Sequence, residues 1–327
     1  MTRRNWTTAL TAFVLAVGSA SGAASAAAPA VAVTLKPIQS LVAALMAGVG
    51  APVLIVDGAA SPHTFTLKPS AARAIAEANI FVRVSPQVEP FTRKVVEGLG
   101  RDVTVITLAE DTPGLTLLDL RTSGTFEPHE HHDGDDEDAN HHGSRAEASP
   151  GSALKDGHLW LDPANAVAIV DRMVRVLSDR DPEHRATFES NAKDLKDKLA
   201  ALDAEIATQL QGDRGKPFLV FHDAIQYFEH RYGLSAAGAI TLSPEQPPSA
   251  KRLAEVRQKV TSHSAVCVFA EPGFQPNLVA AVTEGTSARV ATIDPEGLNL
   301  QPGPALYFEL LRGLARDVSQ CLAGKSG

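Results

Sequence analysis

The stretch DPANAVAIVDRMVRVLSDRDPEHRATFESNAKDLKDKLAALDAEIATQLQ, residues 162–211, predicts two consecutive helices in the middle of the chain. Asp162 is a favourable helix cap, and Pro163 suits a first helical turn. The second part runs for about 28 residues without Gly or Pro, with charge partners four residues apart such as Asp194 and Lys198. A helix of that length spans roughly 40 Å. It is better suited to bridging two lobes than to closing a single core.

Short apolar runs rich in β-branched residues alternate with helical patterns on both sides of this stretch. Strands separated by ten or more helical residues are typical of parallel sheets. The sequence therefore predicts an α/β protein in which two (β/α) lobes with parallel sheets are joined by one long, rigid interlobe helix. The expected strands lie at 31–35, 52–58, 79–84 and 102–108 before the helices, and at 217–221, 236–242, 265–271 and 288–294 after them.

The first residues have the pattern of an export signal. Arg3 and Arg4 form a positive start, and the apolar run from 9 to 20 is too short to cross a bilayer as a helix. Ala24, Ser25 and Ala26 match a small-residue cleavage site. A buried N-terminal helix is disfavoured, because Ser, Gly and Ala would bury little surface. We expect a periplasmic chain that is not inserted in the membrane once its signal is removed.

These patterns predict four segments. They are a signal peptide at 1–26, an N-terminal α/β lobe at 27–160 that includes a disordered His- and acid-rich loop at about 124–150, a helical linker at 161–211, and a C-terminal α/β lobe at 212–327.

Charge and cysteine content narrow the class of protein further. The formal net charge is −8, and no basic stripe suggests a nucleic-acid partner. The chain has two cysteines, Cys267 and Cys321. In an exported protein an isolated pair favours a disulfide over the alternative of two buried thiols.

One segment, PHEHHDGDDEDANHH at 128–142, holds five of the eleven histidines and six carboxylates. Its residues follow neither the hydrophobic period of a strand nor that of a helix, so the segment predicts a disordered loop. Clustered imidazoles and carboxylates bind divalent metals, but weakly where nothing imposes a coordination geometry. We interpret the segment as an accessory low-affinity metal loop; the alternative is a solvated charged loop. Its histidines are His129, His131, His132, His141 and His142.

A defined metal site needs ligands on rigid supports. In parallel α/β folds these supports lie beyond the carboxyl ends of strands. His63 follows the expected strand 52–58, His222 ends the strand 217–221, and Asp294 ends the strand 288–294. His158 comes just before the interlobe helices. These four residues come from both lobes, so we expect them to converge between the lobes.

Five motifs resemble those of the cluster A-I (ZnuA-type) substrate-binding proteins of metal ABC importers. The resemblance runs through nearly the whole chain after the signal, with the motifs in the same order. It implies two (β/α) lobes joined by one rigid helix. The motifs are SPHTFTLKPS (61–70), GHLWLDP (157–163), LVFHDAIQYFEHRYGL (219–234), VFAEPGFQP (268–276) and TIDPEGLNL (292–300).

The resemblance also implies a ligand set of His63, His158 and His222. Manganese members of the family place a carboxylate where this chain has His222, and three imidazoles suit zinc better than manganese. Asp294 matches the family's aspartate, a position that zinc members can leave to a water. Some zinc members have a glutamate where this chain has Pro62, so that ligand is lost here. The family's zinc members also share the acidic, His-rich loop and a disulfide that matches Cys267–Cys321.

The resulting hypothesis is a monomeric periplasmic protein that captures Zn²⁺ between its lobes and delivers it to the membrane permease of a zinc ABC importer. Manganese or iron is the alternative cargo. A zinc hydrolase is a rival hypothesis, but neither HExxH nor a Ser-His-Asp motif occurs. Glu271, the one carboxylate placed to act as its base, is better interpreted as a structural or hydrogen-bonding residue. An adhesin or metal-storage protein of the same fold is a third alternative. His184, His230 and His263 receive no role.

Overall fold

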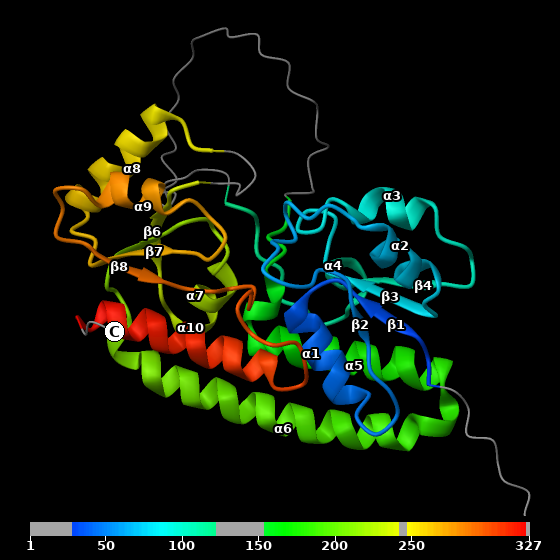
Figure 1. The fold of residues 1–327 in the computed structure, drawn as a ribbon. Helices are drawn as coiled ribbons and strands as arrows, with labels where there is room; N and C mark the ends of the chain where they lie inside the picture. Colours follow the sequence, from blue (N-terminus) through cyan, green and yellow to red (C-terminus); the bar gives the residue numbers. More distant parts are fainter. Residues whose placement is uncertain (1–27, 122–153, 242–246, 325–327) are drawn as a thin grey trace, which may run out of the picture.

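The structure is a computed structural model that describes residues 28–121, 154–241 and 247–324. Two sheets stand side by side above a layer of long helices (Figure 1). This arrangement confirms the predicted α/β architecture of two lobes. The predicted signal at 1–26 and the metal loop with its five histidines lie outside the described residues. Within the described ranges, none of the helices is both long and apolar enough to cross a membrane.

The N-terminal lobe is built on a four-stranded parallel sheet in the order β2-β1-β3-β4. Strands β1 and β3 are completely buried, as expected for a parallel sheet covered on both faces. The strands are β1 (Val31–Val33), β2 (Val53–Leu54), β3 (Ile80–Arg83) and β4 (Thr104–Thr107), and the helices are α1 (Lys36–Leu45), α2 (Pro69–Ala76), α3 (Thr92–Glu97) and α4 (Leu108–Asp111).

The C-terminal lobe repeats this topology, with a parallel sheet in the order β6-β5-β7-β8. Each lobe therefore begins with a central strand and places its second strand at one edge. The strands are β5 (Phe218–Val220), β6 (Ala236–Ala239), β7 (Cys267–Ala270) and β8 (Arg289–Thr292), and the helices are α7 (Gln226–Tyr232), α8 (Ala250–Ser262), α9 (Pro276–Thr283) and α10 (Leu306–Leu322).

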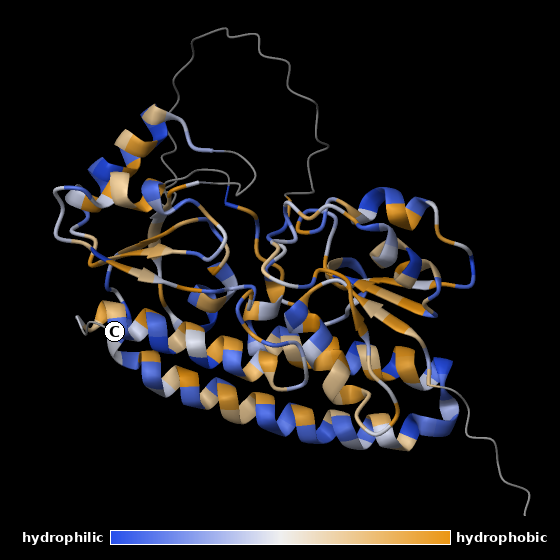
Figure 2. Cartoon of the chain, in the orientation of Figure 1, coloured by the Kyte–Doolittle hydropathy of each residue, from blue (hydrophilic) through white to orange (hydrophobic). Residues whose placement is uncertain are grey.

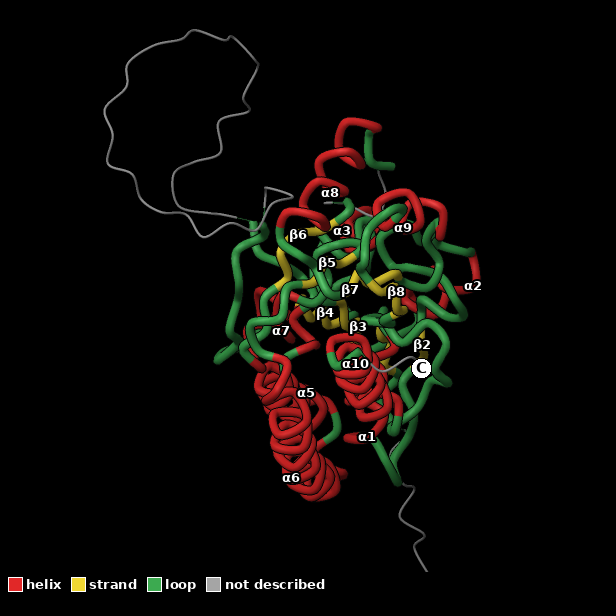
Figure 3. The backbone as a smooth tube through the Cα atoms, turned by 90° about the vertical axis from the view of Figure 1, so that its left-hand side faces the viewer, coloured by secondary structure: helices red, strands yellow, loops and turns green. Residues whose placement is uncertain are grey.

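Two helices connect the lobes, as the central stretch of the sequence predicts. The Asp162 side chain caps α5 (Pro163–Arg180) by accepting a hydrogen bond from Ala164 N at 2.8 Å. After a short 3-10 turn, α6 (Arg185–Leu210) runs for 26 residues, about 39 Å at 1.5 Å per residue. It extends under both lobes (Figure 1), and the end-on view shows it below the sheets (Figure 3).

One face of α6 is apolar and buried, and Figure 2 shows its alternation of hydrophilic and hydrophobic residues. The spacing of three and four residues is that of an amphipathic helix. This face joins a single core cluster that includes strands of both sheets together with α1, α5 and α10. The lobes therefore share a core. The buried residues of α6 are Phe188, Ala192, Leu195, Leu199, Leu202, Ile206 and Leu210.

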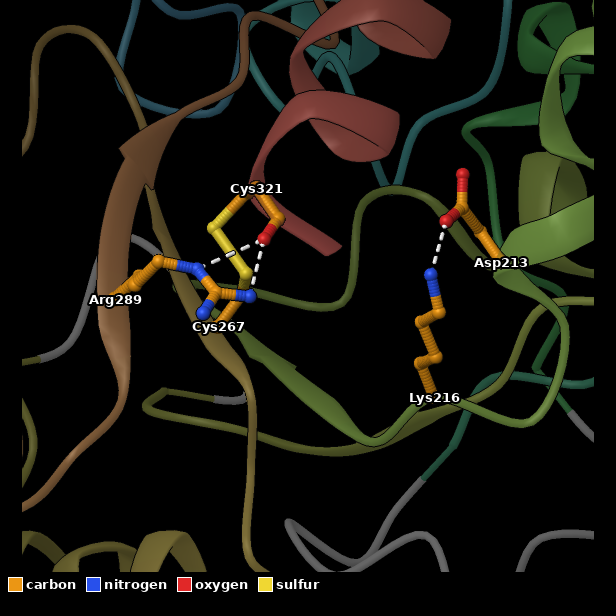
Figure 4. The surroundings of a disulfide bond; sticks show 5 residues. All are labelled: Asp213, Lys216, Cys267, Arg289 and Cys321. Carbon is orange, nitrogen blue, oxygen red and sulfur yellow. Dashed lines mark hydrogen bonds and ion pairs between the residues drawn. A yellow bond between two sulfur atoms is a disulfide. The ribbon is translucent and has the colours of Figure 1, made fainter. Parts of the chain in front are cut away.

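The predicted disulfide joins the C-terminal sheet to the last helix. Cys267 at the start of β7 is bonded to Cys321 near the end of α10, with 6.1 Å between the Cα atoms (Figure 4). The Arg289 guanidinium of β8 donates hydrogen bonds of 2.9 and 2.6 Å to the Cys321 carbonyl. Both β7 and β8 are thus tied to the same helix end.

Candidate metal centre

Three histidines that are far apart in the sequence converge between the lobes. His63 lies on the loop from β2 to α2, His158 precedes the 3-10 turn Leu159–Leu161, and His222 lies two residues beyond β5. One nitrogen atom from each ring lies within 4.8 Å of the other two. Ring centroids are separated by 5.3 to 5.7 Å. The structure thus brings together the three imidazoles that the sequence predicts as ligands.

The spacing of two of these rings suits a shared metal ion. The Nε2 atoms of His63 and His158 are 3.2 Å apart. Two nitrogens bound at about 2.0–2.1 Å to one tetrahedral zinc ion would be about 3.3 Å apart. Little rearrangement of these two rings is therefore needed to place a metal ion between them.

The His158 ring is oriented by a carboxylate from its own loop. Asp156 Oδ1 accepts hydrogen bonds from the His158 Nδ1 at 2.7 Å and from its backbone N–H at 3.0 Å. The Asp156 carbonyl in turn accepts a 2.7 Å hydrogen bond from the Tyr227 hydroxyl. A hydrogen bond from Nδ1 to this carboxylate leaves Nε2 as the ring atom for a ligand. The acidic residue two positions before His158 was the sequence signal for this partner.

The His222 ring has an equivalent partner from a neighbouring strand. Glu271 Oε1 accepts hydrogen bonds from the His222 Nδ1 at 2.8 Å and from its backbone N–H at 3.1 Å. The hydrogen-bonding role expected for Glu271 is confirmed. Nε2 of His222 is buried and has no hydrogen-bond partner within the described part of the chain. Such an atom suits a metal ligand.

His63 is held in its neutral form. Burial, reinforced by repulsion from the imidazoles of His158 and His222, lowers the His63 pKa well below its usual value. A neutral imidazole is the form that coordinates a metal ion. The ring is therefore ready to bind a cation without first losing a proton at neutral pH.

A carboxylate that sequence reasoning missed lies beside His63. Glu296 Oε1 is 3.9 Å from His63 Nε2 and accepts a 3.1 Å hydrogen bond from the Ser61 hydroxyl. Its Oε2 is buried and unpaired within the described residues. Burial raises the Glu296 pKa to about 8. The only sequence signal was a second acid in TIDPEGLNL, two residues after Asp294.

Asp294 has a different environment from the three histidines. Its Oδ1 accepts a hydrogen bond from Leu298 N at 2.9 Å, and its Oδ2 accepts one from Asn299 N at 3.1 Å. It does not belong to the three-histidine group, and both its oxygens hold the turn that carries Glu296. Its role as a ligand stays a prediction.

The remaining described histidines lie outside this group. His184 Nδ1 is 2.6 Å from Asp181 Oδ2, and His263 Nδ1 is 3.0 Å from the Ser262 hydroxyl. Neither these two nor His230 is part of the potential metal site found among the described residues.

Comparisons with known proteins identify a family for this chain. Residues 31–321 match the family described as ZnuA, zinc-uptake complex component A periplasmic. A protein named high-affinity zinc uptake system protein ZnuA, from Brucella suis, is 41% identical over 304 residues, which cover 89% of this chain and 91% of that protein.

Solved structures share the fold. A crystal structure of ZnuA superimposes with a TM-score of 0.73 at 21% identity, covering 90% of this chain and 99% of that one. The laminin-binding protein of Streptococcus agalactiae, described as bifunctional with adhesin and metal transporting activity, superimposes with a TM-score of 0.71 at 25% identity and the same coverage.

Proposed function

This chain belongs to the ZnuA family of periplasmic zinc-uptake components, and on that premise we propose that it captures Zn²⁺ between its lobes. The ion is bound by His63, His158 and His222 and passed to the membrane permease of an ABC importer. The chain acts in the periplasm as a monomer, after removal of residues 1–26.

The observation that carries this proposal is the set of three converging imidazoles, two of which have a buried carboxylate behind them. His158 is oriented by Asp156, and His222 by Glu271. Carboxylate–histidine pairs of this kind orient metal-binding rings and increase their basicity. Three nitrogen ligands favour zinc over manganese, which prefers oxygen-rich sites. Zinc is therefore the cargo we propose, and manganese or iron the alternative.

Glu296 is our candidate for the fourth position. Its Oε1 lies near His63, and its buried Oε2 is unpaired within the described residues. The oxygens of Asp294 already accept backbone hydrogen bonds. We therefore place Glu296 ahead of Asp294, or of a water, as the fourth ligand.

Zinc and manganese titration of the metal-stripped mature protein, in competition with a chelator of known affinity, tests the proposal. We expect one tight zinc equivalent and weaker manganese binding. The tight equivalent should survive deletion of residues 129–142, because we assign the His-rich segment only a low-affinity collecting role. A chain that bound no zinc at neutral pH would contradict the proposal. Loss of tight binding with the deletion would contradict the assignment of the three histidines.

A zinc hydrolase would need a general base placed to take a proton from a metal-bound water. Glu271 accepts two hydrogen bonds from His222, so it orients a ligand rather than a water. Steady turnover of an ester or peptide that vanished in His222→Ala would restore that alternative. The adhesin or storage alternative is distinguished by the absence of a permease gene beside this one.

A further inference from the structure

A buried lysine of the N-terminal lobe is bonded to a loop of the C-terminal lobe. Lys36 is the first residue of α1, and only 5% of its surface is exposed. Its Nζ donates hydrogen bonds to the carbonyls of Gly297 (3.2 Å), Leu298 (2.7 Å) and Leu300 (3.1 Å). An ammonium group has three donors, so all of them can be used at once. These carbonyls belong to the loop between β8 and α10, which also contains Glu296.

We infer that Lys36 is a positioning residue for the metal centre, which clamps the loop 295–300 against α1 and thereby places Glu296 beside His63. This inference rests on the function proposed above. It assigns to Lys36 no contact with the metal ion. Its effect on zinc passes through the carboxylate that it positions.

The loop is anchored on both sides of Glu296. The indole N–H of Trp160 donates a 2.9 Å hydrogen bond to the Pro295 carbonyl, and Lys36 bonds the Gly297 carbonyl on the other side. Gly297 has φ +70°, a left-handed conformation that suits glycine, and a Cβ there would come within 3.1 Å of a Leu310 methyl group. The two anchors therefore hold the backbone on either side of the carboxylate.

A lysine in this position is costly, which argues for a specific role. Burial lowers the Lys36 pKa, while the charges of Asp57 and Asp294 raise it. The cationic group hydrogen-bonds to carbonyls, so much of its desolvation is compensated by neutral acceptors. An apolar residue would fill the same space without that cost, but it could not hold three converging carbonyls.

A small cavity lies between Lys36 and Glu296. The side chains of Lys36 and Glu296 line it together with Pro62 and Trp160, and it offers space for about one water molecule. Pro62 directly precedes the ligand His63. Loss of the ammonium would thus let water and the loop rearrange at the edge of the site.

The test compares Lys36→Met, which keeps most of the length of the side chain and removes its donors, with a matched control. Lys216→Met also removes a partly buried lysine, whose Nζ lies 2.7 Å from Asp213 Oδ1 near the disulfide (Figure 4). Zinc affinity is measured by chelator competition, and Co²⁺ is used as a spectroscopic probe of ligand number and geometry. Thermal unfolding of each metal-free variant checks that it folds.

We expect Lys36→Met to weaken zinc binding about tenfold, the lower end of the range for residues that orient metal ligands, and to change the Co²⁺ spectrum. Lys216→Met should change neither. Glu296→Gln should weaken zinc binding at least as much as Lys36→Met. The double variant should lose little more than Glu296→Gln alone, because Lys36 acts through Glu296. Lys36→Gln, which keeps part of the donor capacity, replaces Lys36→Met if that variant fails to fold.

Two outcomes would overturn the inference alone. One is wild-type zinc affinity and an unchanged Co²⁺ spectrum in Lys36→Met. The other is fully additive losses in the double variant, since Lys36 would then act independently of Glu296. A wild-type protein that bound no zinc would instead overturn the proposed function itself.

Discussion

The two lobes use the same structural position in different ways. In each lobe, a buried glutamate follows the third strand. It accepts a hydrogen bond from a side chain that follows the first strand. In the N-terminal lobe Glu89 accepts from the Thr34 hydroxyl; in the C-terminal lobe Glu271 accepts from the His222 ring. Both lobes have the same strand order, which brings these strand ends together. Only the second pair belongs to the proposed metal centre.

The difference lies in what the first-strand side chain can do with its remaining atoms. The Thr34 hydroxyl is shared between Glu89 and the Val82 carbonyl, so its network closes within the lobe. The imidazole of His222 satisfies Glu271 with one nitrogen and directs the other toward His63 and His158. The repeated strand order thus brings a buried carboxylate to the end of the first strand in each lobe. The side chain opposite each one decides whether that place is structural or binds an ion.

The largest expected difference is between His222 and Thr34, the residues that follow the first strand of each lobe. His222→Ala removes a ligand, and we expect zinc affinity to fall more than about 100-fold, because loss of a ligand's orienting partner alone costs up to that much. Thr34→Ala should leave zinc affinity unchanged and reduce stability only. Chelator competition measures the first effect and urea unfolding the second. Equal losses of affinity in both variants would invalidate the comparison between the lobes.

The disulfide is a covalent difference between the lobes, because it lies in the C-terminal lobe. Cys267 and Cys321 are the chain's only cysteines, and they are 54 positions apart in the sequence. Replacing both by Ala should lower the free energy of unfolding by at most about 4 kcal/mol on the chain-entropy model. Denaturant unfolding of the metal-free protein measures this loss. Zinc affinity should change little, and a loss as large as that in His222→Ala would show that the bond positions the site.

Replacing Glu271 should lower zinc affinity, whereas replacing Glu89 should not. In Glu271→Gln we expect zinc affinity to fall about 10- to 100-fold, because an amide orients the His222 ring without a full negative charge behind it. Glu89→Gln is the matched control and should bind zinc as the wild type does. Competition titrations at constant pH give both values. A Glu271→Gln variant with wild-type affinity would mean that the carboxylate only stabilises the strand ends.

The last comparison involves no change in zinc affinity and concerns the pH dependence of stability that Glu89 causes. Burial raises the Glu89 pKa from 4.5 to about 7. The folded state therefore retains a proton that the unfolded state loses, and this stabilisation is complete below pH 4.5 and is lost as pH rises through about 7. Glu89→Gln has no such group and should not show this loss of stability. As the pH rises across this window, the free energy of unfolding of the wild type should therefore fall relative to that of the variant, by at most about 1.4 kcal/mol per pH unit.

Urea unfolding of the metal-free wild type and Glu89→Gln, measured between pH 4.5 and 8, reveals this difference. Parallel stability curves for the two proteins would contradict it. Other buried acids, Glu296 among them, titrate in both proteins, so they cancel in the comparison.

Much of the architecture was predictable because it depends on local patterns. Alternating apolar runs predicted the eight strands, and the observed strands β1 to β8 lie inside the expected ranges. Asp162 and Pro163 marked the start of α5, and the stretch after Pro182 predicted the long helix α6. Caps, turns and periodicity act over a few residues, so one sequence contains them.

The histidines were predictable for a related reason. Ligands in parallel α/β folds follow strand ends, and strand ends are themselves local features. His63 and His222 could be placed there directly. His158 was a candidate because it comes just before the interlobe helices, and the family resemblance implied all three as ligands. Asp156, two residues before His158, was also visible in the sequence, but its hydrogen bond to the ring was not.

What only the tertiary structure decided is which distant groups meet. Glu271 lies 49 positions from His222, and Lys36 lies more than 260 positions from the carbonyls that it clamps. The different surroundings of Asp294 and Glu296 are the clearest case, since these two acids stand two residues apart in one turn. The sequence by itself determined that a carboxylate would lie in this turn. The folded turn engages Asp294 with backbone N–H groups and directs Glu296 toward His63, because Lys36 and Trp160 from elsewhere in the chain hold the backbone on either side of it.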